Sequence, residues 1–142
     1  DSKFNANVSS KNYVLTDKIT ASLIKYSINS FLASKVIFFN QLKDLFDSSG
    51  AKEDWDFFIN VLDMDKRIGN SHMNVPGHDG RLGFGGACFT KDTAALLKYA
   101  ESLNQEFTLL KKAVKINNNI RSEYDHVDQR EKDQNVNYEF DD

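Results

Sequence analysis

Residues 17–48 read DKITASLIKYSINSFLASKVIFFNQLKDLFDS and contain neither glycine nor proline. Apolar side chains recur here at spacings of three and four residues, the period of one helix face; they are Ile24, Ile28, Phe31, Leu32, Phe39, Leu42 and Phe46. Thr16 and Asp17 are typical of a helix N-cap and an acidic first turn, and Gly50 is typical of a C′ position. The pattern predicts one helix of about 32 residues, or about 48 Å at 1.5 Å per residue.

A helix of that length is longer than the rest of the chain can cover. A compact domain of 142 residues has a radius of gyration of only about 14–15 Å. Val36, Ile37, Phe38 and Phe39 also place apolar groups on every side of the middle of the helix. Both observations predict that a second subunit or domain packs there, and we expect a homodimer formed through this helix.

The rest of the chain predicts an all-α fold with about three further helices. Apolar residues at helical spacing place these helices at about 51–64, 92–103 and 105–121, and Asn104 is expected to cap the last one. The whole chain has only one proline, which fits long helices. We therefore expect an extended lead-in over 1–15, a helical domain over 16–121, and a tail over 122–142 that is partly helical or disordered.

Charge and composition exclude several classes of protein. The net charge is −3, the tail holds eight acidic and two basic residues, and the body holds 13 acidic and 16 basic residues. No Lys/Arg run exceeds two residues, so nothing indicates a nucleic-acid partner. Apolar runs stop at four residues, far below the ~18 needed to cross a membrane. With one cysteine and no signal-peptide pattern, we expect a cytoplasmic protein without internal disulfides.

Residues that alter backbone geometry are concentrated in one loop. Six of the seven glycines lie between Gly69 and Gly86, together with Pro76, and Cys88 follows directly. A long irregular loop on an ordered scaffold is usually either functional or disordered. Helical patterns flank this loop on both sides and it carries apolar side chains, which favours a functional loop.

The end of this loop, residues 83–92, reads GFGGACFTKD. Glycines let backbone N–H groups approach a ligand, and the helix that follows would favour an anion at its N-terminus. Such a place lowers the pKa of a cysteine, Lys91 adds positive charge, and Asp92 lies one helical turn after Cys88. The pattern outlines an activated thiol, but a tight turn with a buried, inert cysteine fits it as well. It is not the G-x-G-x-x-G dinucleotide fingerprint.

Two further groups of polar residues are candidates for chemistry. Lys25 and Asn29 share one face of the long helix and could donate hydrogen bonds to an oxyanion, or could simply lie at its polar rim. His72 and His78 have no partner at a zinc-like spacing, so we expect no metal site. A Cys88–His78 hydrolase pair is another arrangement, which spacing alone does not decide.

Four stretches, in order, resemble the UDP-glucose/GDP-mannose dehydrogenase family. Residues 24–33 (IKYSINSFLA) are similar to its K-Y-x-x-N-x-F-L-A stretch, Phe39-Asn40 fits the same helix, and residues 67–69 look like its R-I-G motif. Residues 83–92 look like its G-F-G-G-x-C-F-P-K-D loop, with Thr90 in place of proline as an expected helix N-cap. The likeness covers residues 16–121, and residues 76–80 (PGHDG) favour the UDP-glucose 6-dehydrogenase branch.

The resemblance implies a two-step oxidation of the C6 alcohol of UDP-glucose to UDP-glucuronate, with two NAD molecules reduced, as a step of polysaccharide biosynthesis. Cys88 would be the nucleophile that forms a thiohemiacetal and then a thioester. Lys25 and Asn29 would stabilise the oxyanion or hold water, and Asp92 would act as general base. The resemblance further assigns substrate binding to Phe84, Gly85 and Gly86, to Arg67 acting on a neighbouring subunit's UDP-sugar, and NAD contact to Lys91.

The family also has a Rossmann domain before this region and a nucleotide-sugar domain after it, and neither fits in this chain. NAD would then be bound mainly by a domain that this chain lacks. Two classes of function stay open: the catalytic central domain of a larger Rossmann-type enzyme, or a helical dimerisation module without turnover of its own.

Overall fold

The computed structural model of the chain describes residues 14–125 and 129–138. This part of the chain contains five helices and no strand: α1 (Lys18–Ser48), α2 (Trp55–Asp63), α3 (Ala87–Ser102), α4 (Thr108–Ser122) and α5 (Gln129–Asp133). The predicted all-α fold with one very long helix is confirmed, and α5 is additional to the helices expected. None of the helices in the described part is long and apolar enough to cross a membrane.

Helix α1 begins and ends at the signals that predicted it. The Asp17 carboxylate caps the N-terminus by accepting the Thr20 N–H at 3.0 Å. At the other end Ser49 is the C-cap, and Gly50 follows with a φ of 75°, the left-handed conformation that glycine adopts without strain. The intervening 31 residues form one uninterrupted helix.

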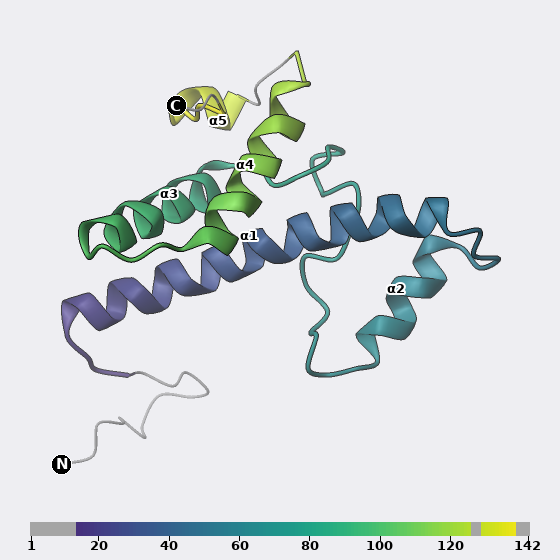
Figure 1. The fold of residues 1–142 in the computed structure, drawn as a ribbon, viewed down its shortest axis with the longest axis horizontal. Helices are drawn as coiled ribbons and strands as arrows, with labels where there is room; N and C mark the ends of the chain where they lie inside the picture. The colour runs from purple at the N-terminus through teal and green to yellow at the C-terminus, as the bar shows by residue number, and fades with distance from the viewer. Residues whose placement is uncertain (1–13, 126–128, 139–142) are drawn as a thin grey trace.

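The other elements lie on two sides of α1 (Figure 1). In that view α2 lies on one side of α1, and α3, α4 and α5 lie on the other. The irregular segment over 64–86 passes from α2 across α1 to α3. Helices α3 and α4 contact each other and α1. The glycine-rich segment is thus held between elements that come from both halves of the chain.

Two apolar clusters line these two sides. In the first, Ile37 of α1 packs with Phe84 of the irregular segment and Ala113 of α4. In the second, Phe39 of α1 packs with Trp55 of α2 and with Met73. The chain itself therefore buries Ile37 and Phe39, whereas the intervening Phe38 stays 59% exposed. A second subunit was predicted to cover the apolar residues in the middle of α1. Of these, Phe38 remains accessible to such a partner, whereas Ile37 and Phe39 do not.

The structure corrects several helix boundaries. Helix α3 begins at Ala87 rather than near 92, so Thr90 is not its N-cap; Gly86 is, and the Thr90 hydroxyl donates to the Gly86 carbonyl at 2.9 Å. Helix α2 begins later than expected, behind the Asp54 cap. Asn104 does not cap α4: its φ of 54° places it in the preceding turn.

The two ends of the chain are described only in part. The lead-in over 1–13 lies outside the described residues, and residues 14–17 form neither helix nor strand. Helix α4 ends at Ser122, and the described part of the tail contains the separate helix α5. Residues 126–128 and 139–142 lie outside the described part.

Candidate functional site

The buried carboxylate of Asp92 joins α3 to α1. Asp92 is 3% exposed, and its Oδ2 accepts a hydrogen bond from Asn29 Nδ2 at 2.6 Å. Its other oxygen lies 3.9 Å from the Lys25 ammonium, whose side chain is 67% exposed. The spacing that placed Lys25 and Asn29 on one face of a helix is confirmed, since both meet the same carboxylate. A buried carboxylate needs such partners, because an unpaired charge inside a protein is costly.

Cys88 lies in the first turn of α3, one turn before Asp92. Its side chain is exposed, so the alternative of a buried, inert cysteine is excluded. The N-cap Gly86 has a φ of 79° and caps the helix without a side chain. The N–H groups of a first turn carry partial positive charge that favours an anion. An accessible thiol therefore lies in the first turn of α3.

The glycine segment before α3 is held by asparagine side chains from two helices. The Gly83 N–H donates to Asn40 Oδ1 on α1 at 2.9 Å, and the Phe84 N–H donates to Asn117 Oδ1 on α4 at 2.6 Å. Gly83 has a φ of 72°, and a Cβ there would lie 2.5 Å from Asn117 Oδ1. Glycine is thus required at this position both by the backbone angle and by the close approach of Asn117.

Phe84 itself faces inward. Its side chain is 4% exposed and meets the Phe89 ring edge-on, with centroids 6.1 Å apart. Any contact of Phe84 with a substrate is therefore limited to its main chain. The neighbouring Gly85 and Gly86 belong to the same backbone segment, and the Gly86 N–H donates to Glu131 Oε1 at 3.0 Å. Lys91, the candidate for NAD contact, is exposed on α3.

Arg67 lies apart from the group around Asp92. Its guanidinium is 90% exposed and pairs with Asp65, and these hydrogen bonds lower the pKa of the Asp65 carboxyl. The stretch after it is fixed by Lys35, whose buried ammonium donates to the carbonyls of Ile68 and Gly69, each at 3.1 Å. Burial lowers the pKa of Lys35, and the nearby Asp63 offsets part of this effect. The Arg67 side chain therefore extends into solvent from a backbone segment that Lys35 holds in place.

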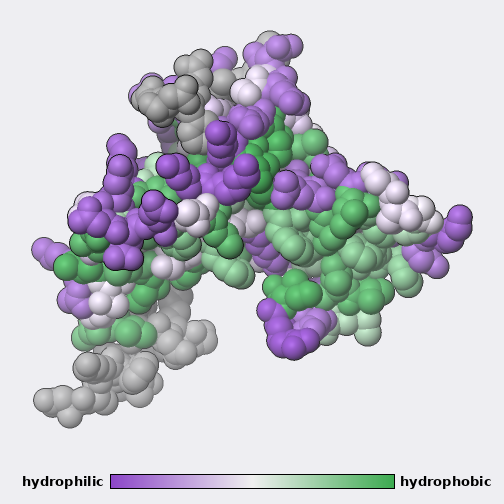
Figure 2. Space-filling model, in the orientation of Figure 1, coloured by the Kyte–Doolittle hydropathy of each residue, from purple (hydrophilic) through white to green (hydrophobic). Residues whose placement is uncertain are grey.

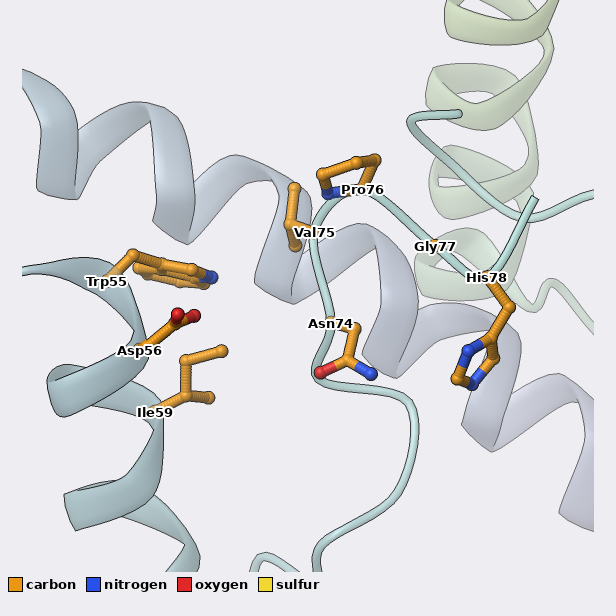
Figure 3. Close-up of a pocket in the computed structure, with 8 residues that line it drawn as sticks. All are labelled: Trp55, Asp56, Ile59, Asn74, Val75, Pro76, Gly77 and His78. Carbon is orange, nitrogen blue, oxygen red and sulfur yellow. The ribbon is translucent and has the colours of Figure 1, made fainter. Parts of the chain in front are cut away.

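The histidines lie in different surroundings. His78 lines a cavity of about 290 Å³ between α2 and the 74–78 stretch (Figure 3), whose lining includes Trp55 and Asn74 but not Cys88. His72 instead contacts the first turn of α3, with its ring centroid 5.4 Å from that of Phe89. Burial lowers the pKa of His72, and the charge of Lys35 adds to the effect. In the part of the chain described, no three His, Cys, Asp or Glu residues are grouped so that they could hold a metal.

Most of the polar residues that hold the loop were not predicted from the sequence. Lys35, Asn117, Arg121 and Glu131 all contact the irregular segment and are all at most 9% exposed. The one usable signal is a polar residue within an apolar helix face, as at Lys35 and in the asparagine run 117–119. Glu131 gives no such signal, because it lies in a tail dominated by acidic residues.

Comparison with known proteins identifies the family. The sequence model described as "UDP-glucose/GDP-mannose dehydrogenase family, central domain" matches residues 19–119. The chain belongs to this family. The matched residues include Lys25, Asn29, Cys88 and Asp92, so the group around Asp92 lies inside the matched region.

Named relatives agree with this membership. The chain is 38% identical over 104 residues to UDP-glucose 6-dehydrogenase YwqF of Bacillus subtilis (strain 168), an alignment that covers 73% of this chain and 22% of that protein. It is 39% identical over 106 residues to UDP-glucose 6-dehydrogenase of Rickettsia felis, covering 74% and 22%. The chain thus spans about a fifth of the length of the curated relatives that it matches. No solved structure gives a significant match.

Proposed function

We propose that this chain is the central catalytic and dimerisation domain of an NAD-dependent nucleotide-sugar 6-dehydrogenase that oxidises UDP-glucose to UDP-glucuronate. The observation that carries the proposal is the exposed Cys88 one helical turn before a buried Asp92 that is paired with Asn29 and Lys25. The names of the relatives support the choice of UDP-glucose over other nucleotide sugars.

In this proposal the Cys88 thiolate attacks the aldehyde carbon formed by oxidation of the C6 alcohol. A carbon–sulfur bond forms, and the carbonyl oxygen becomes an alkoxide that takes up a proton as the thiohemiacetal. The second oxidation removes a hydride and a proton to give a thioester. Water then adds to the thioester carbon, the carbon–sulfur bond breaks, and the carboxylate and the Cys88 thiolate are released. Thiolates suit this task because they are the reactive form of cysteine.

The residues around Asp92 have separate roles in these steps. The Lys25 ammonium and the second N–H of the Asn29 amide would donate to the oxygen that carries developing negative charge. Asp92 would hold both donors in place and accept a proton from the attacking water. The main chain of Gly85 would hold the sugar beside Cys88, because the N–H groups of Phe84 and Gly86 already donate to Asn117 and Glu131. The exposed side chain of Arg67 would reach the UDP-sugar of a second subunit.

NAD supplies the oxidising power by accepting hydride, but the residues of this chain do not fit a dinucleotide site. The sequence contains no G-x-G-x-x-G, and the described residues contain no strand that could lead into such a turn. We therefore assign NAD binding to residues outside this chain, with Lys91 as the contact expected from here. Accordingly, we expect the 142-residue chain alone to produce no NADH from UDP-glucose.

A second copy of the chain is the proposed occupant of an apolar groove formed by α1, α2 and α4. The groove has a volume of about 1000 Å³, and Phe31, Phe38 and Leu109, each at least 59% exposed, line it. Figure 2 shows apolar side chains gathered over α2 and the C-terminal half of α1. Exposed apolar patches of this kind typically mark an interface. The length of α1 supports a second copy of the chain as the partner, because the other helices of the same chain leave one face of α1 uncovered.

The decisive experiment replaces Cys88 by serine in the longer protein that contains this domain. UDP-glucuronate and NADH formation should fall by several orders of magnitude, because removing a nucleophile removes the covalent step. Thermal unfolding should stay unchanged, because the side chain is exposed. Lys98→Ala, an exposed change on the same helix, is the control and should keep full activity. Near-normal turnover of Cys88→Ser would refute the proposed mechanism.

A further inference from the structure

The tail residue Glu131 lies buried against the glycine segment. Its side chain is 2% exposed although it belongs to the five-residue helix α5. One carboxylate oxygen, Oε1, accepts the Gly86 N–H at 3.0 Å, and the Tyr138 hydroxyl donates to the same oxygen. Burial and the hydrogen bond to Glu131 raise the pKa of Tyr138, which keeps its hydroxyl protonated as a donor. The tail therefore contacts the N-cap residue of the helix that carries Cys88.

Arginine side chains neutralise this buried carboxylate. Arg121 Nη1 lies 4.0 Å from Glu131 Oε1 and donates to Asp79 Oδ2 at 2.7 Å, while Arg121 Nη2 donates to the Gly83 carbonyl at 3.0 Å. Arg81 Nη1 lies 3.8 Å from Glu131 Oε2. Charges removed from water are tolerated when they are paired and hydrogen-bonded in this way. Two cations and two carboxylates thus surround the glycine segment from α4, α5 and the loop itself.

Gly85 is the position that allows this close approach. A Cβ at Gly85 would lie 2.6 Å from Glu131 Oε1 and 2.7 Å from Arg121 Nη1, too near for any side chain. Its φ lies outside the left-handed region, so the backbone angle is not what requires glycine here. The absence of a side chain is explained instead by the Arg121–Glu131 pair packed directly on the backbone.

We propose that Glu131 is a positioning residue of the catalytic loop, acting through the Gly86 main chain. Asn40 and Asn117 hold the N–H groups of Gly83 and Phe84, and Glu131 separately holds the Gly86 N–H at the start of α3. Both Arg121 and Glu131 follow residue 119, where the match to the family model ends. The catalytic meaning of this placement rests on the function proposed above, because it is the first turn of α3 that presents Cys88.

The test measures amide hydrogen exchange of single residues by NMR in the 142-residue chain. In Glu131→Ala the Gly86 amide should exchange about tenfold faster or more, since it loses a hydrogen bond to a charged acceptor. The Gly83 and Phe84 amides should stay near their wild-type rates, because other side chains hold them. Glu131→Gln should restore most of the Gly86 protection, since its carbonyl oxygen can still accept the N–H. Glu123→Gln, an exposed change in the same acidic tail, is the matched control and should alter none of the three.

Gly85→Ala is a second route to the same contact. Its new methyl group would displace the Arg121–Glu131 pair, so Gly86 should again lose protection while Gly83 keeps more of its own. If Glu131→Ala does not fold, Gly85→Ala provides the test in its place. Equal acceleration of Gly83, Phe84 and Gly86 would overturn the proposal, because Glu131 would then only stabilise the fold as a whole. An unchanged Gly86 amide, or a Gln variant as fast as the Ala variant, would overturn it as well.

The exchange experiment is independent of turnover. It uses no NAD and no sugar, so it can succeed if Cys88 proves not to be a nucleophile. It can equally fail while Cys88→Ser abolishes UDP-glucuronate formation. The two proposals are therefore separable by their readouts.

Discussion

Asp92 on α3 accepts a hydrogen bond from Asn29 on α1 at 2.6 Å, although 63 residues separate the two in the sequence. The contact joins the helix that presents Cys88 to the helix that spans the domain. One buried carboxylate therefore serves both the packing of the fold and the proposed chemistry.

Replacing Asp92 by alanine should destabilise the chain by about 1–3 kcal/mol. The half-buried Asn29 amide would lose a hydrogen bond to a charged acceptor, and such a bond contributes about that much. Urea unfolding at neutral pH measures the change. Glu101→Ala, which removes an exposed carboxylate near the C-terminal end of the same helix, should be close to neutral. An Asp92 variant as stable as wild type would show that the contact contributes nothing to the fold.

The helix that dominates the fold was predictable because its signals are local. Asp17 as N-cap and Gly50 after the C-terminus, with no breaker between them, determine α1 without any tertiary information. The start of α3 was predicted about five residues too late, because Gly85 and Gly86 read as loop up to the cysteine. Asn104 was predicted to cap the next helix, but its positive φ places it in a turn, whose conformation depends on tertiary packing.

Lys25→Ala in the longer protein should lower kcat by about 10²–10³-fold with a smaller effect on KM for UDP-glucose, as expected for loss of an oxyanion donor. Stability should hardly change, because the Lys25 side chain is 67% exposed and exposed ion pairs contribute only about 0–1 kcal/mol. Steady-state kinetics and thermal unfolding measure the two effects. Lys18→Ala, at the exposed start of α1, is the control. A rise in KM alone would assign Lys25 to substrate binding.

Phe38→Asp should convert a dimer into a monomer. Phe38 lines the apolar groove and is 59% exposed, so a charge there would be buried without a partner in the interface. Sedimentation at micromolar concentration should give about twice the 16.2 kDa chain mass for wild type and a single chain for the variant. Leu103→Asp, an equally exposed apolar position outside the groove, should remain dimeric. A monomeric wild-type chain would refute the proposed dimer.

The contacts that hold the glycine segment could not be predicted, for a physical reason. Asn117, Arg121 and Glu131 act on backbone groups 33 or more residues earlier, and no local pattern specifies which buried polar side chain meets which backbone group. A polar residue in an apolar helix face signals that a partner exists, because a buried polar group requires one. It does not identify the partner, so the candidate site was predicted from motif residues and its supports were not.

The ion pair between Asp79 and Arg121 should make stability depend on pH in the acid range. Burial alone would raise the pKa of Asp79, but hydrogen bonds from Arg121 and from the Arg81 N–H, with the charges of both arginines, lower it below 3.8. A carboxyl whose pKa is lowered by folding contributes stability above its unfolded pKa and loses that contribution as pH falls through the folded pKa.

Asp79→Asn should therefore cost stability at pH 6 and cost progressively less as pH falls through the folded pKa of Asp79, below which the wild-type carboxyl is also neutral. The difference at pH 6 should be about 1 kcal/mol, at the low end for a charged hydrogen bond because solvent screens a side chain that is 35% exposed. Urea unfolding of both proteins across this range measures it. The control is Asp65→Asn: the pKa of Asp65 is also lowered, by its hydrogen bonds to Arg67, but that pair is exposed. Asp65→Asn should therefore cause no measurable pH-dependent change in stability. A change as large as that of Asp79→Asn would mean that the burial of Arg121 does not explain the stability contributed by the Asp79–Arg121 pair.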